Sequence, residues 1–375
     1  MADVLQFSRS TRVYIAQAGT EASLWEIPVL DGFSFSQATN ATEIVLSEMT
    51  SSLGASRRAR AMFTDSYAPA EWSFSTYARP NTGGAVEEAL WANFIAANDF
   101  IVAAVPNQWT EGVTKASPVT TFDFASSNST ILGEFDIYFV LGGCGIDAST
   151  VPYNPAGGQT IYKISGAVAN TASVDFEIDG ISMITWSGFG SIITEEASLD
   201  ATSAIVDGIT GTGNFIRNRL TTLSCDGSAT TSAFVTFDAD YSLVLTGGNI
   251  TFENNITYLT PETLCTVNQP IGHITGARSI SGNFTCYLNA PTVGVSSAEL
   301  FEDIIAATDV VTNSFDLSFG IGGATAPKIA MNFPNCHLEV PQHSIEDVIS
   351  IDTTFNALPT TIDAADEATI VYTGV

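Results

Sequence analysis

The chain has 375 residues, and its 12 Lys and Arg against 40 Asp and Glu give a formal net charge of −28. Charged residues make up only 14% of the chain, against about 25% in an ordinary soluble domain, so the acidity reflects a shortage of bases. So few cations exclude tight, charge-driven binding to nucleic acid or to an anionic membrane, and 45% hydrophobic residues exclude a disordered chain.

Short alternating runs dominate from the first residues to the last. Apolar side chains recur at every second position in 33–35, 72–74, 135–139 and 315–319, which is the period of half-buried strands. Gly-Gly pairs, including 247–248, punctuate these runs and are interpreted as turns. The sequence therefore predicts a mainly β chain.

Two stretches have helical periodicity. Residues 86–97 place Val86, Leu90 and Phe94 on one face, and residues 297–308 repeat the pattern with Leu300 and Ile304. No apolar run reaches about 18 residues, and residues 1–10 lack an apolar core, so we expect neither a transmembrane helix nor a secretory signal. The five cysteines have no CxxC spacing and are expected to be reduced, packed thiols.

The chain contains an internal repeat. Residues 135–143 (FDIYFVLGG) recur as 315–323 (FDLSFGIGG), and residues 74–77 (FSTY) recur as 284–287 (FTCY). Further matches keep the same order in both halves, which indicates a duplication. We predict two tandem copies of a β-sandwich or barrel domain, 1–196 and 214–375, joined by a linker, 197–213. Each copy has one short flanking helix and a long loop.

Several segments resemble the major tail tube proteins of tailed bacteriophages. They are 25–36 (WEIPVLDGFSFS), 69–77 (PAEWSFSTY), 246–251 (TGGNIT) and 258–264 (YLTPETL). In that family six domains close a ring, rings stack into a tube, and some members carry the domain twice and form the ring from three chains. The resemblance implies a homotrimeric, pseudo-hexameric ring, in a virion tail that is assembled in the host cytoplasm.

The same resemblance implies the partners and the surfaces. The chain would bind itself, the tape measure protein and the tail terminator and tip proteins, while DNA passes through without specific binding and no membrane or cofactor is involved. An acidic, Lys-poor wall would repel phosphate at short range. Ser34, Ser36, Thr251 and Glu253 are candidates for the lumen, since they alternate with apolar neighbours.

Arg57, Arg58 and Arg60 form the one basic cluster. A nucleic-acid contact, a processing site and a solvated loop are alternatives. In so acidic an assembly we favour a subunit-contact loop that docks on an acidic neighbour.

Enzymatic and metal-binding interpretations have little support in the sequence. Cys336, His337, Glu339 and His343 are loosely spaced for a metal site, and a strand that packs Cys inward and His outward explains them better. The pairs 87–88 and 195–196 could be glycosidase carboxylates, although a helix start and a linker border explain them. We predict no catalytic, cofactor or metal residues. The alternatives to a tube subunit are a β-rich adhesin or carbohydrate-binding module and a polysaccharide-cleaving enzyme.

Six aromatic residues are predicted to belong to the cores of the two copies rather than to a site. They are Trp72, Tyr77, Trp91, Phe284, Tyr287 and Phe301.

Overall fold

The computed structural model describes residues 5–21, 24–44, 61–98, 109–125, 132–143, 151–154, 158–205, 209–227, 241–264, 267–289, 295–306, 314–362 and 364–375. These residues form a mainly β protein, as predicted, with the helices α1 (Glu88–Ile95) and α2 (Ser297–Ala306) and a short 3-10 turn, Asn218–Leu220. Within the described ranges, neither helix has the length and apolarity to cross a membrane.

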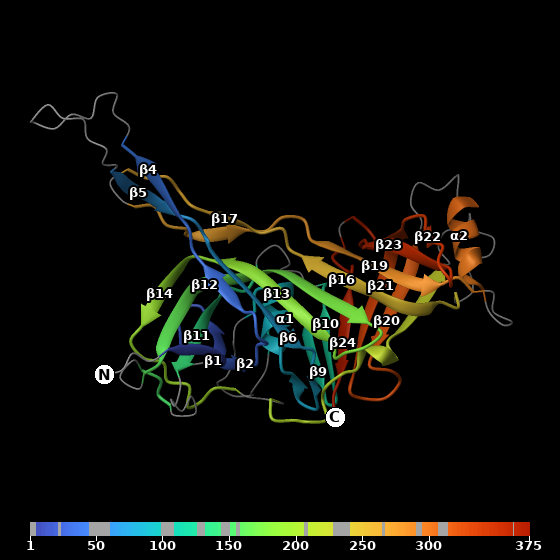
Figure 1. Ribbon diagram of the computed structural model, residues 1–375, viewed down its shortest axis with the longest axis horizontal. Coiled ribbons are helices and arrows are strands. Elements are labelled where there is room, and N and C mark those ends of the chain that lie inside the picture. Colours follow the sequence, from blue (N-terminus) through green and yellow to red (C-terminus); the bar gives the residue numbers. More distant parts are fainter. Residues whose placement is uncertain are drawn as a thin grey trace, which may run out of the picture.

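The central feature is one continuous antiparallel sheet, called the long sheet below. It contains strands from both ends of the chain, and Figure 1 shows it extending across the molecule. Its order is β3 (Ser34–Ser36), β6 (Ala70–Tyr77), β13 (Met183–Gly190), β12 (Thr160–Glu177), β16 (Val244–Glu253), β19 (Ser279–Tyr287) and β23 (Ser350–Ala357), with β22 (Gln342–Ser344) and the end of β21 (Lys328–Leu338) beside β23.

Two further sheets pack behind the long sheet. The first contains β1 (Gln6–Gln17), β2 (Trp25–Ile27), β11 (Phe135–Gly143), the start of β12 and β14 (Ile192–Glu196). The second contains β15 (Thr222–Gly227), β20 (Phe315–Ile321), the start of β21, β24 (Thr369–Thr373), β10 (Val119–Asp123) and β9 (Val113–Ala116). A short hairpin of β7 (Pro80–Asn81) and β8 (Gly84–Ala85) precedes α1.

A single apolar core lies between these layers and runs through both halves of the chain. Strand alternation supplies much of it, because every second residue of β6, of β19 and of β12 from Ala172 to Phe176 is buried. Three cysteines of the described part, Cys225, Cys286 and Cys336, are free and buried, as the sequence predicted. At about 25 cal/mol per Å² of buried apolar surface, such a core is the main stabilising contribution to the fold.

Large rings lie over glycines on neighbouring strands of the long sheet. A Cβ atom added at Gly188 would come within 2.7 Å of the Trp72 ring, and one at Gly248 within 2.9 Å of the Phe176 ring. The prediction of a turn at 247–248 is therefore wrong. Gly247 and Gly248 both lie inside β16, and the Phe176 ring from β12 needs the space that a side chain at Gly248 would fill.

The helices and core aromatics correct the sequence analysis in detail. The chain at Ala96 is extended, so α1 ends before the predicted residue 97. Trp72, Trp91 and Phe284 are buried as predicted. Tyr77 and Tyr287 instead occupy outward positions of their strands, and Phe301 is half-buried against the His343 ring, with centroids 4.8 Å apart.

Candidate assembly surfaces

The outward face of the long sheet is polar. Side chains alternate between core and solvent along each strand, and the outward set is mostly Ser, Thr, Asn, Asp and Glu, with Tyr77, Met183, Phe189 and Tyr287 near strand ends. The polar set comprises Ser34, Ser36, Glu71, Ser73, Ser75, Thr185, Ser187, Thr171, Ser173, Asp175, Glu177, Asn249, Thr251, Glu253, Ser281, Asn283, Thr285, Asp352, Thr354 and Asn356. No Lys or Arg occupies an outward position on these fully described strands.

The four residues predicted to line a bore all lie on this face. Ser34 and Ser36 of β3 are exposed, opposite Ser73 and Glu71 of β6. Thr251 and Glu253 of β16 lie opposite outward residues of β12 and β19. The structure thus brings together two pairs that are separated by more than 200 residues in the sequence, and the acids Asp175, Glu177 and Asp352 join them on the same surface.

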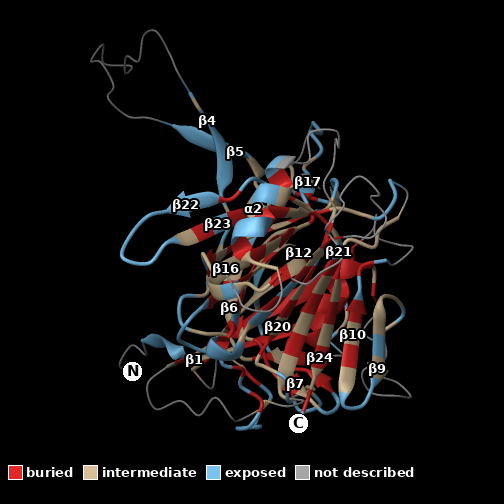
Figure 2. Cartoon of the chain, turned by 90° about the vertical axis from the view of Figure 1, so that its right-hand side faces the viewer, coloured by how far each residue is buried: buried red, intermediate tan, exposed pale blue. Residues whose placement is uncertain are grey.

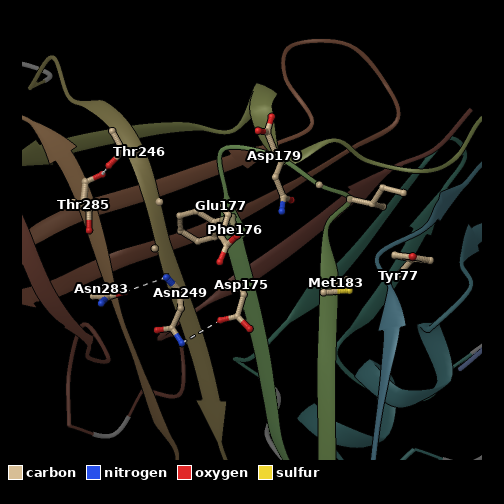
Figure 3. Close-up of a pocket in the computed structure, with 15 residues that line it drawn as sticks. Tyr77, Asp175, Phe176, Glu177, Asp179, Met183, Thr246, Asn249, Asn283 and Thr285 are labelled. Atoms are coloured by element: carbon tan, nitrogen blue, oxygen red, sulfur yellow. Dashed lines mark hydrogen bonds between the residues drawn. The ribbon is translucent and has the colours of Figure 1, made fainter. Parts of the chain in front are cut away.

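Hydrogen bonds between strands organise this polar face. The hydroxyl oxygens of Ser75 and Thr185 lie 3.0 Å apart. Asn249 donates to the Asp175 carboxylate at 3.4 Å, and its backbone N–H donates to the Asn283 side-chain oxygen at 3.1 Å, as Figure 3 shows. These donors are therefore engaged with neighbouring side chains, and the net charge of the face is negative.

The cations of the described part lie mainly behind this sheet, paired with acids. Lys115 Nζ lies 2.9 Å from Glu88, and Lys163 Nζ lies 3.0 Å from Asp136. Arg278 is 3.5 Å from Glu367 and is largely buried, and this burial lowers its pKa. Within the described part of the chain, no acid of the polar face forms an ion pair.

The long sheet has an open edge at each end. Inside the chain, β12 and β16 pair from Thr171 opposite Glu253 to Glu177 opposite Gly247. In the described part of the chain, β3 pairs only with β6 and β22 pairs only with β23. Unpaired strand edges of this kind are templates for pairing with another chain.

A two-part arm projects from one end of the molecule. It contains the hairpin of β4 (Thr39–Glu43) and β5 (Met62–Tyr67), beside which runs the second-half segment with β17 (Thr257–Leu259) and β18 (Gly272–Ile274), as Figure 1 shows. The Tyr67 N–H donates to the Asn268 carbonyl at 2.9 Å, which joins the two parts. The β4–β5 strands are largely exposed (Figure 2). The predicted contact residues Arg57, Arg58 and Arg60 fall between β4 and β5, outside the described residues.

The carboxylate pair at 87–88 is closed to any polymer substrate. Both side chains are fully buried, rather than simply solvated at a helix start. Burial raises the pKa of Glu87 to about 7, and the Arg79 backbone N–H donates to its two carboxylate oxygens at 3.2 and 3.3 Å. Glu88 pairs with Lys115 and accepts a hydrogen bond from the Trp109 indole.

The residues considered and set aside as a metal site follow the strand interpretation. Cys336 is buried in β21, and the neighbouring His337 is only partly buried. Among the residues that the structure describes, no group of three or more His, Cys, Asp and Glu side chains is placed to hold a metal ion.

Arg79 was not identified by the sequence analysis. It is buried at the end of β6, and its guanidinium donates to the carbonyls of Ile209 and Gly211 at 2.7 Å each and to the Asn214 side chain. It also lies over the Phe215 ring, 4.4 Å from the centroid. Arg79 thus joins residues 209–215 to the segment that follows β6. No local pattern could reveal this, because the partners are about 130 residues away.

Comparisons with known proteins add one relative. No family model matches the chain. The chain is 30% identical over 377 residues to the tail tube protein pb6 of Escherichia phage T5, an alignment that covers 97% of this chain and 75% of that protein. The likeness therefore extends over both halves rather than over one motif.

Proposed function

The chain belongs to the tail tube proteins of tailed phages, and we propose that three copies of it close into a pseudo-hexameric ring that stacks into the tube. It is a structural component of the virion tail that assembles with itself and with other tail proteins. The proposal adds the number of chains, the surfaces that join them and the face that lines the bore. It assigns no enzymatic role, and nothing in the comparisons supports an adhesin.

Two tandem domains, 1–196 and 214–375 with the linker 197–213, are part of this proposal. The strand order supports it. The first half contributes β3, β6, β13 and β12 to the long sheet, and the second half contributes β16, β19, β23 and β21 in the same order. In each half the last strand, β12 or β21, also enters the sheet behind.

The β12–β16 pairing is the observation that carries ring closure. If the halves are equivalent, this joint inside one chain has a counterpart between chains, where β22 and the end of β21 meet β3 of the next copy. Those are the two open edges of the long sheet. A closed ring would leave neither edge exposed.

The polar face would then line the bore, with Ser34, Ser36, Thr251 and Glu253 at its surface. Acids that are not in ion pairs repel phosphate within about 8 Å at physiological ionic strength, so DNA would pass without being held. The tape measure protein would occupy the same bore before ejection, and the terminator and tip proteins would close the ends of the tube. Assembly would take place in the host cytoplasm.

A disulfide trap tests ring closure. Strand equivalence places Ser36 of one chain opposite Gln342 of the next, as Thr251 lies opposite Ser173 inside the chain. We expect the double variant Ser36→Cys with Gln342→Cys to oxidise into a covalent trimer, read on non-reducing gels and by native mass spectrometry.

The matched control is Ser173→Cys with Thr251→Cys, whose bond forms within one chain and leaves the mass unchanged. A Ser36/Gln342 variant that stays monomeric, or that forms an open ladder beyond three chains, overturns the proposed ring.

A further inference from the structure

A hollow called the end groove lies where β6, β12, β13, β16 and β19 of the long sheet meet the 179–181 turn and Asn218 (Figure 3). Its volume is about 990 Å³, and it adjoins a smaller hollow of about 230 Å³. Glu177 and Asn218 line both hollows and therefore lie where the two meet. The tube function described above assigns no ligand to this groove.

Three carboxylates follow one another along the end groove. Asp175 and Glu177 are outward residues at the end of β12, and Asp179 follows them in the turn (Figure 3). Outward side chains two residues apart on a strand are separated by roughly 7 Å. Asn249 donates to Asp175 at 3.4 Å, and the exposed Arg219 lies 3.9 Å from Asp179. Within the described part of the chain, Arg219 is the one cation that pairs with any of these acids, so the groove keeps a net negative charge.

Asn218 adds a buried acceptor to the groove. The residue is 7% exposed, and its side-chain oxygen has no hydrogen-bond partner among the residues that the structure describes. Its backbone is held in place, because its N–H donates to the Gly180 carbonyl at 3.2 Å. A buried acceptor without a partner is costly, so this oxygen favours an incoming N–H group. The oxygen and the carboxylates thus favour the same kind of ligand group, a positively charged N–H donor.

The groove also has an apolar margin. Ile181 and Met183 line the larger hollow, Ile178 and Tyr287 line the smaller one, and all four are exposed large apolar residues. The buried ring of Phe176 lines both hollows. An alkyl chain that carries a positive charge covers apolar surface with its methylene groups while its charged end reaches an acid. Acids beside apolar side chains therefore suit a ligand that combines both features.

The spacing of the acids favours several separated charges over one metal ion. Among the described residues, no group of three or more His, Cys, Asp and Glu side chains is placed to hold a metal ion. Single ion pairs at an exposed surface contribute little, so a ligand needs several of them together with apolar contact. A chain of three or four methylene groups separates two ammonium groups by about the distance between neighbouring outward residues of a strand.

We propose that the end groove binds a linear polyamine, an alkyl chain that carries two or more ammonium groups. The ammonium groups pair with Asp175, Glu177 and Asp179, and one of them also donates to the Asn218 oxygen. The methylene groups pack on the apolar margin that includes Met183. This inference goes beyond tube assembly, because a single chain contains the whole site. The bound polyamine offsets part of the negative charge at this end of the polar face.

Isothermal titration calorimetry of the purified chain with spermidine, at physiological ionic strength, tests the site. We expect one spermidine per chain. Asp175→Asn with Glu177→Gln should weaken binding by roughly tenfold or more, because two of the three acids lose their charge. Asn218→Ala should weaken binding by about fivefold, since it removes the buried acceptor. Circular dichroism confirms that each variant is folded, and the outward acids can be changed without disturbing the core.

The matched control is Glu195→Gln with Glu196→Gln, which removes two charges from β14 and should bind spermidine like the parent. Hexylamine, with one charge on an alkyl chain, should bind at least about tenfold more weakly than spermidine. Equal losses of affinity in the groove and β14 variants would reduce the effect to a general attraction of an acidic chain for cations. Complete displacement of spermidine by an equal concentration of Mg²⁺ would do the same, and either result overturns the site. Failure of the parent to bind spermidine also overturns it and leaves ring closure unaffected, because the titration uses the single chain.

Discussion

The two helices have similar sequence patterns but very different surroundings. Every residue of α1 is buried, and Trp91 at its centre packs edge-on against the rings of Trp186 and Phe252, with centroids 4.8 and 5.4 Å apart. Figure 2 shows α2 largely exposed, and its residue Ile305 is 50% exposed. Helical periodicity alone would give both helices one buried and one solvated face.

α1 packs on β10 and β12 of its own half, and the other half of the chain completes its cover. The Trp91 indole N–H donates to the Tyr372 hydroxyl of β24 at 2.9 Å, and the Asn254 amide donates to the Phe94 carbonyl at 3.0 Å. In the proposed tandem arrangement, the half that would cover α2 in the same way belongs to another chain. The difference between the helices then marks where one chain ends and its neighbour begins, and variants at matched positions of the two helices test this explanation.

The largest expected difference is at the matched pair Trp91 and Phe301. Trp91→Ala should lower the free energy of unfolding by about 3–5 kcal/mol, because it empties a fully enclosed site. Phe301→Ala should cost under about 1 kcal/mol in the isolated chain, since the ring is half exposed. Urea unfolding at pH 7 measures both. Equal losses of unfolding free energy in the two variants would show that the enclosure of α1 does not contribute to stability.

The next effect is a pH dependence at the start of α1. Burial raises the pKa of Glu87 to about 7, against 4.5 for a free side chain, so the folded protein holds this proton more tightly than the unfolded chain. The resulting stabilisation is complete below about pH 4.5 and is lost as the pH rises through 7, at most about 3 kcal/mol.

Glu87→Gln should remove this contribution, so that stability falls less between pH 5 and pH 8 than in the parent. Glu299→Gln, on the exposed side of α2, is the matched control and should keep the parental profile. Unfolding free energies at several pH values measure the effect. A parental slope in Glu87→Gln would contradict the assignment to Glu87.

These contrasts show what the sequence could and could not predict. The alternation that places Ser34, Ser36, Thr251 and Glu253 on one face is local, so the pattern predicts their common side without knowledge of the fold. The burial of α1 depends on Tyr372, 281 residues from Trp91, and no local pattern contains that contact.

The turn predicted at 247–248 failed for the same reason. Glycine usually marks turns. At Gly248 the reason for glycine is different, because the Phe176 ring of β12, more than 70 residues away in the chain, lies where a side chain would be. The buried Asn218 was likewise missed, since the lack of a partner for its side-chain oxygen among the described residues becomes visible only when the surrounding strands are in place. Local periodicity thus fixes which side of a strand a residue occupies, whereas distant partners decide what lies against it.

A smaller effect should follow from removing one second-half residue that covers α1. Asn254 is 3% exposed, and its amide donates to the carbonyls of Phe94 and Ala169 at 3.0 and 3.2 Å. Asn254→Ala leaves these buried acceptors without that donor and should cost about 1–3 kcal/mol. Asn40→Ala, which removes an exposed hydrogen bond to Ser66, should cost much less. Thermal unfolding compares the midpoint temperatures of the two variants. Equal shifts of the midpoint would show that Asn254 does not contribute to the cover of α1.

The smallest effect on stability should come from the outward side of α2. Ile305→Glu changes a half-exposed side chain, so the unfolding free energy of the isolated chain should move by no more than about 0.5 kcal/mol. If a neighbouring chain covers α2 as the second half covers α1, the same variant places an unpaired charge in each of three joints. Native mass spectrometry should then show monomers where the parent gives trimers. If Ile305→Glu forms trimers as readily as the parent, α2 lies on the outside of the ring. The contrast between the helices then reflects only their places in one chain.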